Sequence, residues 1–176
     1  MLKIAQAFTV SFSAGLGGRL TGNTTQVVDY RGDCSPVTAV PDDYHLFLNW
    51  TGTGDFAATT QNPAVVADVT EDMTVSAHFR KILSPMQRLC ERVRNRSLSQ
   101  VEYINVLRWS ASPENADLPL DAFRIFEIVG GARVLKAQTG LQTTEYRHRN
   151  AGTAARTYHI VYVANGVEGE PLVVTL

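Results

Sequence analysis

Few residues in this 176-residue chain are spaced for catalysis or for metal binding. The four histidines are scattered, and none forms the i, i+4 pair that would place two imidazoles on one helix face. Cys34 and Cys90 lie far apart, outside any CxxC or Cys/His pattern, and no base is suggested beside either thiol. We therefore expect no enzymatic activity and no metal or other cofactor. Two free, buried thiols are expected, with a disulfide between them as the lesser alternative.

The tripeptide Arg31-Gly32-Asp33 has the sequence that integrins recognise. It falls between two strand-like stretches, where a turn needs glycine for its backbone conformation. Because a triplet of common residues often arises by chance, the motif is only a weak indication of integrin binding. A plain turn is the favoured interpretation.

The densest basic cluster lies at residues 88–96. On an extended strand, Arg92, Arg94 and Arg96 would share one face because side chains alternate. Such a basic strand could bind phosphates or an acidic polysaccharide. We favour the competing interpretation, in which the arginines solvate an exposed strand at the edge of a sheet.

Period-two alternation predicts the strands that would position a site in the second half of the chain. Their inward side chains should form one core: Leu107, Trp109, Phe123, Ile125, Tyr158, Ile160, Tyr162 and Ala164. The outward side chains of the same strands are also mostly apolar. They form a candidate interaction face, because contiguous apolar surface usually marks an interface: Phe126, Ile128, His159, Val161 and Val163.

The order of these features resembles a fibronectin type III domain over residues 85–176. The resemblance rests on Trp109 in one strand, Phe123 opening the next, Tyr158 opening a later strand, and the Ala-Asn-Gly turn at residues 164–166. It implies a seven-stranded β-sandwich that acts as an extracellular interaction module. It also implies a tyrosine corner, in which the hydroxyl of Tyr158 bonds back to the loop that starts near Arg149.

The first half consists of short alternating strands separated by turns, with no sustained 3.6-residue period. The expected strands are Phe8–Phe12, Gln26–Tyr30, Val37–Val40, Leu46–Trp50 and Met73–Phe79. Their order, with an Asn-Trp-Thr-Gly turn at 49–52 and a closing Met-Thr-x-x-Ala-x-Phe, resembles the divergent internalin B-repeat over residues 7–80. These all-β modules occur in secreted and surface-anchored bacterial proteins. Asp43-Tyr44 departs from the family, which usually has glycine before the aromatic residue.

A change of composition divides the chain into domains at residues 1–80 and 85–176, with a linker at 81–84. Residues 1–80 carry four basic and eight acidic residues, a net charge of −4, whereas residues 84–176 carry eleven and nine, a net +2. Neither half is basic enough for nucleic-acid binding. No apolar run reaches the ~18 residues of a membrane span, so no membrane insertion is expected. Met1–Ala5 is too short for a secretion signal, and we expect the chain to start after one.

The predicted fold is all-β, a small B-repeat-like domain followed by a seven-stranded fibronectin type III-like sandwich. The predicted function is a non-catalytic module of a bacterial secreted or cell-surface protein, acting as spacer, stalk or adhesive unit. Neighbouring modules of the same protein are the expected partners, with a surface protein or a polysaccharide as further candidates. The alternative is an accessory carbohydrate-binding unit of a larger extracellular hydrolase. Its aromatic candidates are Tyr30, Tyr44, Tyr146 and Trp50, although we expect Trp50 in the core.

Overall fold

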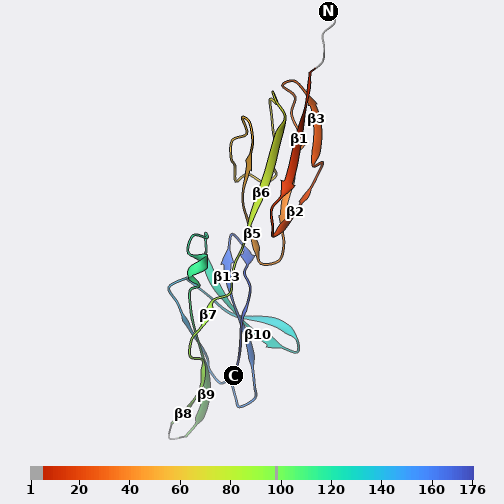
Figure 1. Ribbon diagram of the computed structural model, residues 1–176. Coiled ribbons are helices and arrows are strands. Elements are labelled where there is room, and N and C mark those ends of the chain that lie inside the picture. Colours follow the sequence, from red (N-terminus) through yellow and green to blue (C-terminus); the bar gives the residue numbers. More distant parts are fainter. Residues whose placement is uncertain (1–5, 98) are drawn as a thin grey trace, which may run out of the picture. The chain divides into compact units, whose positions relative to one another are not determined.

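The computed structural model describes residues 6–97 and 99–176 (Figure 1). Residues 1–5, on which the expectation about a secretion signal rests, lie outside the described residues. The fold is all-β, as predicted, with one short 3-10 helix, η1 (Pro113–Asn115), in the described part. Contacts divide the chain into two compact units, unit 1 at Met1–Lys81 and unit 2 at Ile82–Leu176. No helix among the described residues is long and apolar enough to cross a membrane.

Unit 1 is built on a four-stranded sheet in the order β3–β1–β6–β5, with a second sheet of β2 and β4. Its strands are β1 (Ala7–Ala14), β2 (Gly18–Thr21), β3 (Thr25–Asp29), β4 (Thr38–Pro41), β5 (His45–Gly52) and β6 (Met73–Lys81). β1 runs parallel to β6, with Val10 opposite Met73, whereas β3 and β5 pair antiparallel to their neighbours. The strands therefore lie where alternation predicted them, but the parallel pairing joins segments far apart in the sequence.

The core of unit 1 surrounds Trp50, which is fully buried, as expected. Phe12 meets the Trp50 ring edge-on, with 6.1 Å between centroids, and Phe47 lies 5.8 Å from it. The loop after β5 closes over this core, because the backbone N–H of Trp50 donates to the carbonyl of Thr59 at 2.7 Å. Trp50 is thus a packing residue and offers no flat face to a ligand.

A hydrogen-bonded turn at residues 42–45 precedes β5. The N–H of His45 donates to the carbonyl of Asp42 at 3.0 Å and closes the turn. Tyr44 takes a left-handed backbone conformation, with φ at 64°. Bulky residues rarely adopt this conformation, so the backbone at Tyr44 is locally strained.

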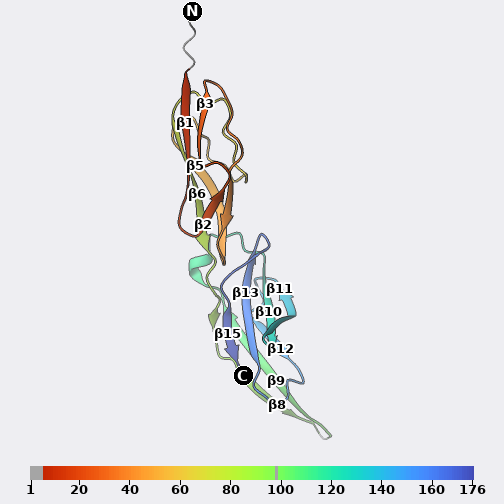
Figure 2. The ribbon, with the colours of Figure 1, turned by 90° about the vertical axis from the view of Figure 1, so that its right-hand side faces the viewer.

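Unit 2 consists of two sheets (Figure 2). One has the order β12–β9–β7, and β8 follows β7 along the same edge of β9. The other has the order β11–β10–β13–β14. β15 also pairs with β13, at an earlier part of that strand than β14 does. The strands are β7 (Met86–Gln87), β8 (Glu91–Arg96), β9 (Val101–Ser110), β10 (Ala122–Val129), β11 (Ala132–Thr139), β12 (Glu145–His148), β13 (Thr157–Ala164), β14 (Val167–Glu168) and β15 (Leu172–Thr175).

The two sheets of unit 2 face each other across an aromatic core. Trp109 on β9 meets Phe123 on β10, with 5.4 Å between centroids, and Phe123 lies 4.7 Å from Tyr162 on β13. All eight side chains predicted to point inward are buried, so the predicted core positions are confirmed: Leu107, Trp109, Phe123, Ile125, Tyr158, Ile160, Tyr162 and Ala164.

The segment expected as a linker, residues 81–84, is held by unit 2. Ile82 is fully buried, and its carbonyl accepts the N–H of Glu170 at 2.9 Å. The side chain of Asn115 accepts the N–H of Leu83 at 3.1 Å and donates to its carbonyl at 2.9 Å. Two of the four residues are therefore fixed parts of the sandwich rather than a free connection.

Both cysteines are free, as expected. Cys34 is buried in unit 1, and this burial, together with the Asp33 carboxylate, raises the pKa of its thiol. Cys90 is only partly buried, and its sulfur accepts the N–H of Arg108 at 3.3 Å.

Candidate interaction surface

A row of four side chains crosses one sheet of unit 2 on the side away from Trp109. Leu135, Phe126, His159 and Val173 stand directly opposite one another on β11, β10, β13 and β15. Leu135 and Val173 are 53% and 51% exposed, whereas Phe126 and His159 are half-buried. We call this side of the sheet, including the flanking Arg124, Arg133, Ile128 and Glu168, the outer face.

The outer face is less open than the sequence predicted. Val161 and Val163 are only 2% and 4% exposed, so the expectation that they form exposed apolar surface is wrong. Val161 lies opposite Arg124, and Val163 lies opposite Glu168. Because opposite side chains are neighbours on a sheet, the Arg124–Glu168 ion pair, at 3.2 Å, shields both valines.

Phe126 and Ile128 do point outward, but both are half-buried. The guanidinium of Arg133 lies over the Phe126 ring, 3.8 Å from its centroid, and also pairs with Glu168 at 2.8 Å. His159 is half-buried beside them, and its pKa is lowered by burial and by the nearby charge of Arg133. The exposed ends of the row, Leu135 and Val173, were missed, because each has an apolar neighbour in its strand and period two alone does not select which one points outward.

The predicted basic strand divides into one structural arginine and two exposed ones. Arg92 donates from Nε to the Asn105 side chain at 2.8 Å, and from its terminal nitrogens to the carbonyls of Thr153 and Ala154. It also donates to the carbonyl of Leu176. Arg94 and Arg96 are exposed on β8. The expectation of a three-arginine binding face is therefore wrong for Arg92, whose donors hold the end of the sandwich.

Arg31-Gly32-Asp33 forms a turn braced by the loop that precedes β6. Arg31 takes a left-handed conformation with φ at 63°, and its N–H donates to the carbonyl of Val69 at 2.7 Å. A carboxylate oxygen of Asp33 accepts the N–H of Asp68 at 2.9 Å. One oxygen of this exposed carboxylate is thus engaged by the loop before β6, and a plain turn stays the favoured interpretation.

A buried polar cluster at one end of the sandwich was not predicted. The hydroxyl of Tyr158 accepts a hydrogen bond from the Asn105 amide at 2.9 Å and lies 2.7 Å from Nδ1 of His148. The predicted tyrosine corner is therefore wrong in its partner: the Tyr158 hydroxyl binds side chains of β9 and β12 instead of the loop near Arg149. Burial raises the pKa of Tyr158 and lowers that of His148.

Glu127 extends this cluster and is nearly inaccessible, with 4% exposed. Arg156 donates to one of its carboxylate oxygens, and Lys136 lies 3.3 Å from the other. Burial acts to raise the pKa of Glu127, but the hydrogen bonds from Arg156 and Lys136 outweigh it and lower the pKa. Glu127 follows Phe123 and Ile125 at period two, so the pattern that predicted the core would also have placed this carboxylate inside.

The cluster links strands of both sheets, and within it Asn105, Tyr158 and Glu127 are buried while His148 is half-buried. Its imidazole, phenol and carboxylate are engaged with one another or with arginine and lysine. Among the described residues, no group of three or more His, Cys, Asp and Glu side chains could hold a metal ion.

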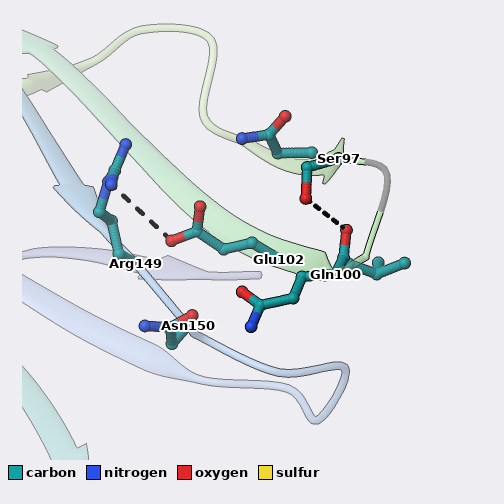
Figure 3. Close-up of a pocket in the computed structure, with 7 residues that line it drawn as sticks. Ser97, Gln100, Glu102, Arg149 and Asn150 are labelled. Carbon is teal, nitrogen blue, oxygen red and sulfur yellow. Dashed lines mark hydrogen bonds and ion pairs between the residues drawn. The ribbon is translucent and has the colours of Figure 1, made fainter.

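A polar cleft of about 400 Å³ lies where the turn joining β8 and β9 approaches the segment after β12 (Figure 3). Its lining consists of Asn95, Ser97, Gln100, Val101, Glu102, Arg149 and Asn150. Arg149 and Glu102 pair across it at 3.9 Å, a long and exposed contact that contributes little. The lining has no aromatic ring.

The two exposed aromatic candidates of unit 1, Tyr30 and Tyr44, do not lie side by side. Tyr30 and Tyr44 are 51% and 41% exposed in unit 1. The N–H of Tyr30 bonds to Gln6, just before β1, whereas the turn holding Tyr44 bonds through Asp42 to Gly17, beyond the end of β1. The eight residues of β1 separate them by roughly 25 Å. Tyr146 lies on β12 and is half-buried.

A family model for the divergent InlB B-repeat domain matches residues 8–83. This match spans β1 to β6 and confirms the resemblance of the first half of the chain. A search of curated proteins finds no match to the chain. The comparisons thus place a domain of a family found in bacterial surface proteins in unit 1.

Proposed function

We propose that this chain is a non-catalytic module of a bacterial secreted or cell-surface protein, with unit 2 as an adhesive interaction unit. The observation that carries the proposal is the family match at residues 8–83, because that family is found in bacterial surface proteins. A role as spacer or stalk is the competing form of the same proposal.

The assignment of unit 2 to the fibronectin type III family belongs to this proposal. Its support is the strand order: β7 and β8 with β9 and β12 in one sheet, and β11, β10, β13 and β14–β15 in the other. The buried contact of Trp109 with Phe123 between the sheets adds to it. Sandwiches of this kind serve many functions, so the family by itself implies no ligand.

An adhesive role is favoured over a pure spacer by the outer face. Leu135 and Val173 are both more than half exposed on strands of one sheet, whereas a spacer has no need of apolar surface there. A non-catalytic role is supported by the buried cluster of unit 2, whose ionisable side chains bind one another.

Two measurements test the proposal. Antibody labelling of intact cells that express the parent protein should detect the chain at the surface, and labelling only after lysis would refute the location. Tagged, folded chain should then be retained on matrix proteins or on cells. Folded chain that is retained on no surface would refute the adhesive role and favour the spacer.

The alternative, an accessory carbohydrate-binding unit, is favoured only by the amide-rich cleft of Figure 3. Its test is an added set of insoluble polysaccharides in the same retention experiment. Retention on one polysaccharide that is lost in Asn95→Ala and Gln100→Ala variants would support the alternative over protein adhesion.

A further inference from the structure

The outer face carries more positive than negative charge. Arg124 and Arg133 pair with the two oxygens of one carboxylate, that of Glu168, at 3.2 and 2.8 Å. The carboxylate of β10, that of Glu127, is turned inward to Arg156 and Lys136. Two guanidinium groups therefore share a single negative charge, which leaves one positive charge without a counterion within this ion-paired group.

The position of Arg133 leaves it able to bind a further carboxylate. The central carbon of its guanidinium lies 3.8 Å from the centroid of the Phe126 ring, so the group is held at the surface of the outer face. Its side chain remains 41% exposed after pairing with Glu168. An arginine that is already held by an aromatic ring and a carboxylate loses less entropy when it binds a second carboxylate.

The charged pair flanks apolar surface that crosses the whole sheet. The row Leu135–Phe126–His159–Val173 spans four strands, or roughly 14 Å. Its outermost residues are the most exposed, at 53% and 51%. A polysaccharide would engage the arginines but could not bury these aliphatic ends, whereas apolar side chains of a protein could.

We propose that the outer face docks an acidic protein segment whose apolar side chains cover Leu135, Phe126 and Val173 while its carboxylates bind Arg133 and Arg124. This inference rests on the proposed adhesive function and specifies the chemistry of its partner. Charge complementarity identifies the segment as acidic, and the apolar row identifies it as protein.

The test is selection of random linear peptides, displayed on phage, against the full chain. We expect the enriched peptides to combine Asp or Glu with aliphatic or aromatic residues, and their affinity to fall as NaCl is raised. Leu135→Ser and Arg133→Gln should each weaken binding by about tenfold or more. Val134→Ser and Arg94→Gln are the matched controls, since Val134 neighbours Leu135 on the opposite side of β11 at 42% exposed, and Arg94 lies on β8 of the other sheet. These controls should leave binding within about twofold.

Several results would overturn the inference. These are an absence of binding peptides, affinity unchanged by Leu135→Ser and Arg133→Gln, or displacement by an acidic polysaccharide with no dependence on Leu135. Concentration-dependent dimerisation in sedimentation that is abolished by Leu135→Ser would also overturn it, because a second copy would then cover the face. If the Leu135→Ser chain is retained on cells as well as the parent is, the docking role of the outer face is refuted, while the adhesive function is not. If the folded parent chain is itself not retained on any surface, the adhesive function is refuted.

Discussion

The two units bury different kinds of side chain. The core of unit 1 is apolar throughout: Val10, Phe12, Trp50, Val75 and their neighbours pack together. Among the buried polar residues of the described part, only Gln26 belongs to unit 1, and it bonds to Ser35 and Asn23 nearby in the sequence. Unit 2 instead buries Asn105, Asn115, Ser112 and Glu127, most of them bonded to residues far along the chain.

This difference shows what stabilises each unit. In unit 1 the buried polar side chain, Gln26, bonds only to nearby residues, so the long-range contacts between its buried side chains are apolar. In unit 2 an apolar core around Trp109 and a polar cluster around Tyr158 both connect the two sheets. Buried polar groups stabilise only when all are paired, so unit 2 should be the more sensitive to single polar substitutions.

The largest expected effect tests the feature that both units have, a buried tryptophan packed against phenylalanine. Trp109→Ala should destabilise unit 2 by about 3–5 kcal/mol, because it leaves a large cavity against Phe123. The chain has two tryptophans, Trp50 in unit 1 and Trp109 in unit 2. Trp50 fluorescence in denaturant therefore follows unit 1 in this variant, while circular dichroism follows both units. A loss below about 1 kcal/mol would contradict the central role of Trp109.

The next effect separates the two kinds of arginine on β8. Arg92→Gln should destabilise unit 2 by about 2–3 kcal/mol, because it removes charged donors from Asn105 and from three backbone carbonyls. Arg94→Gln, two residues along on the same strand and exposed, should change stability by less than about 0.5 kcal/mol. The measurement is the free energy of unfolding in denaturant. Equal losses of stability in the two variants would mean that the hydrogen bonds of Arg92 contribute nothing.

A smaller effect is expected when only one hydroxyl is removed from the polar cluster. Tyr158→Phe should cost about 1–2 kcal/mol, since the Asn105 amide and His148 lose a buried partner while the ring still packs. The control is Tyr30→Phe in unit 1, whose side chain is 51% exposed and should tolerate the change. A Tyr158→Phe chain as stable as the parent would show that the cluster is dispensable.

The smallest effect concerns pH. The pKa of His148 is lowered in the folded state, so between that pKa and the unfolded value near 6.5 the unfolded chain binds more protons. The stability that neutral His148 contributes is therefore fully present above about pH 6.5, and it is lost as the pH falls toward the folded pKa. The lowered pKa of Glu127 adds a second loss below its usual value of 4.5. Denaturation midpoints measured across this range should decline less steeply in His148→Gln, and an unchanged slope would contradict the assignment.

The candidate surface was predictable in part. Alternation placed Phe126, Ile128 and His159 on the outer face, but it could not reveal that Arg124 and Glu168 would pair over Val161 and Val163. Exposure depends on which residues stand opposite one another, and that depends on strand pairing. The role of Arg92 was missed for the same reason, since its partners Thr153, Ala154 and Leu176 lie far along the chain.

The sequence by itself determined the all-β class, the positions of most strands, the inward side chains of unit 2 and the B-repeat resemblance of residues 7–80, which the family match at residues 8–83 supports. These follow from period-two alternation and turn residues, which are local properties of the chain. Only the tertiary structure decided the parallel pairing of β1 with β6, the partners of Tyr158 and the shielding of the outer face. These depend on contacts between distant segments, which no local pattern encodes.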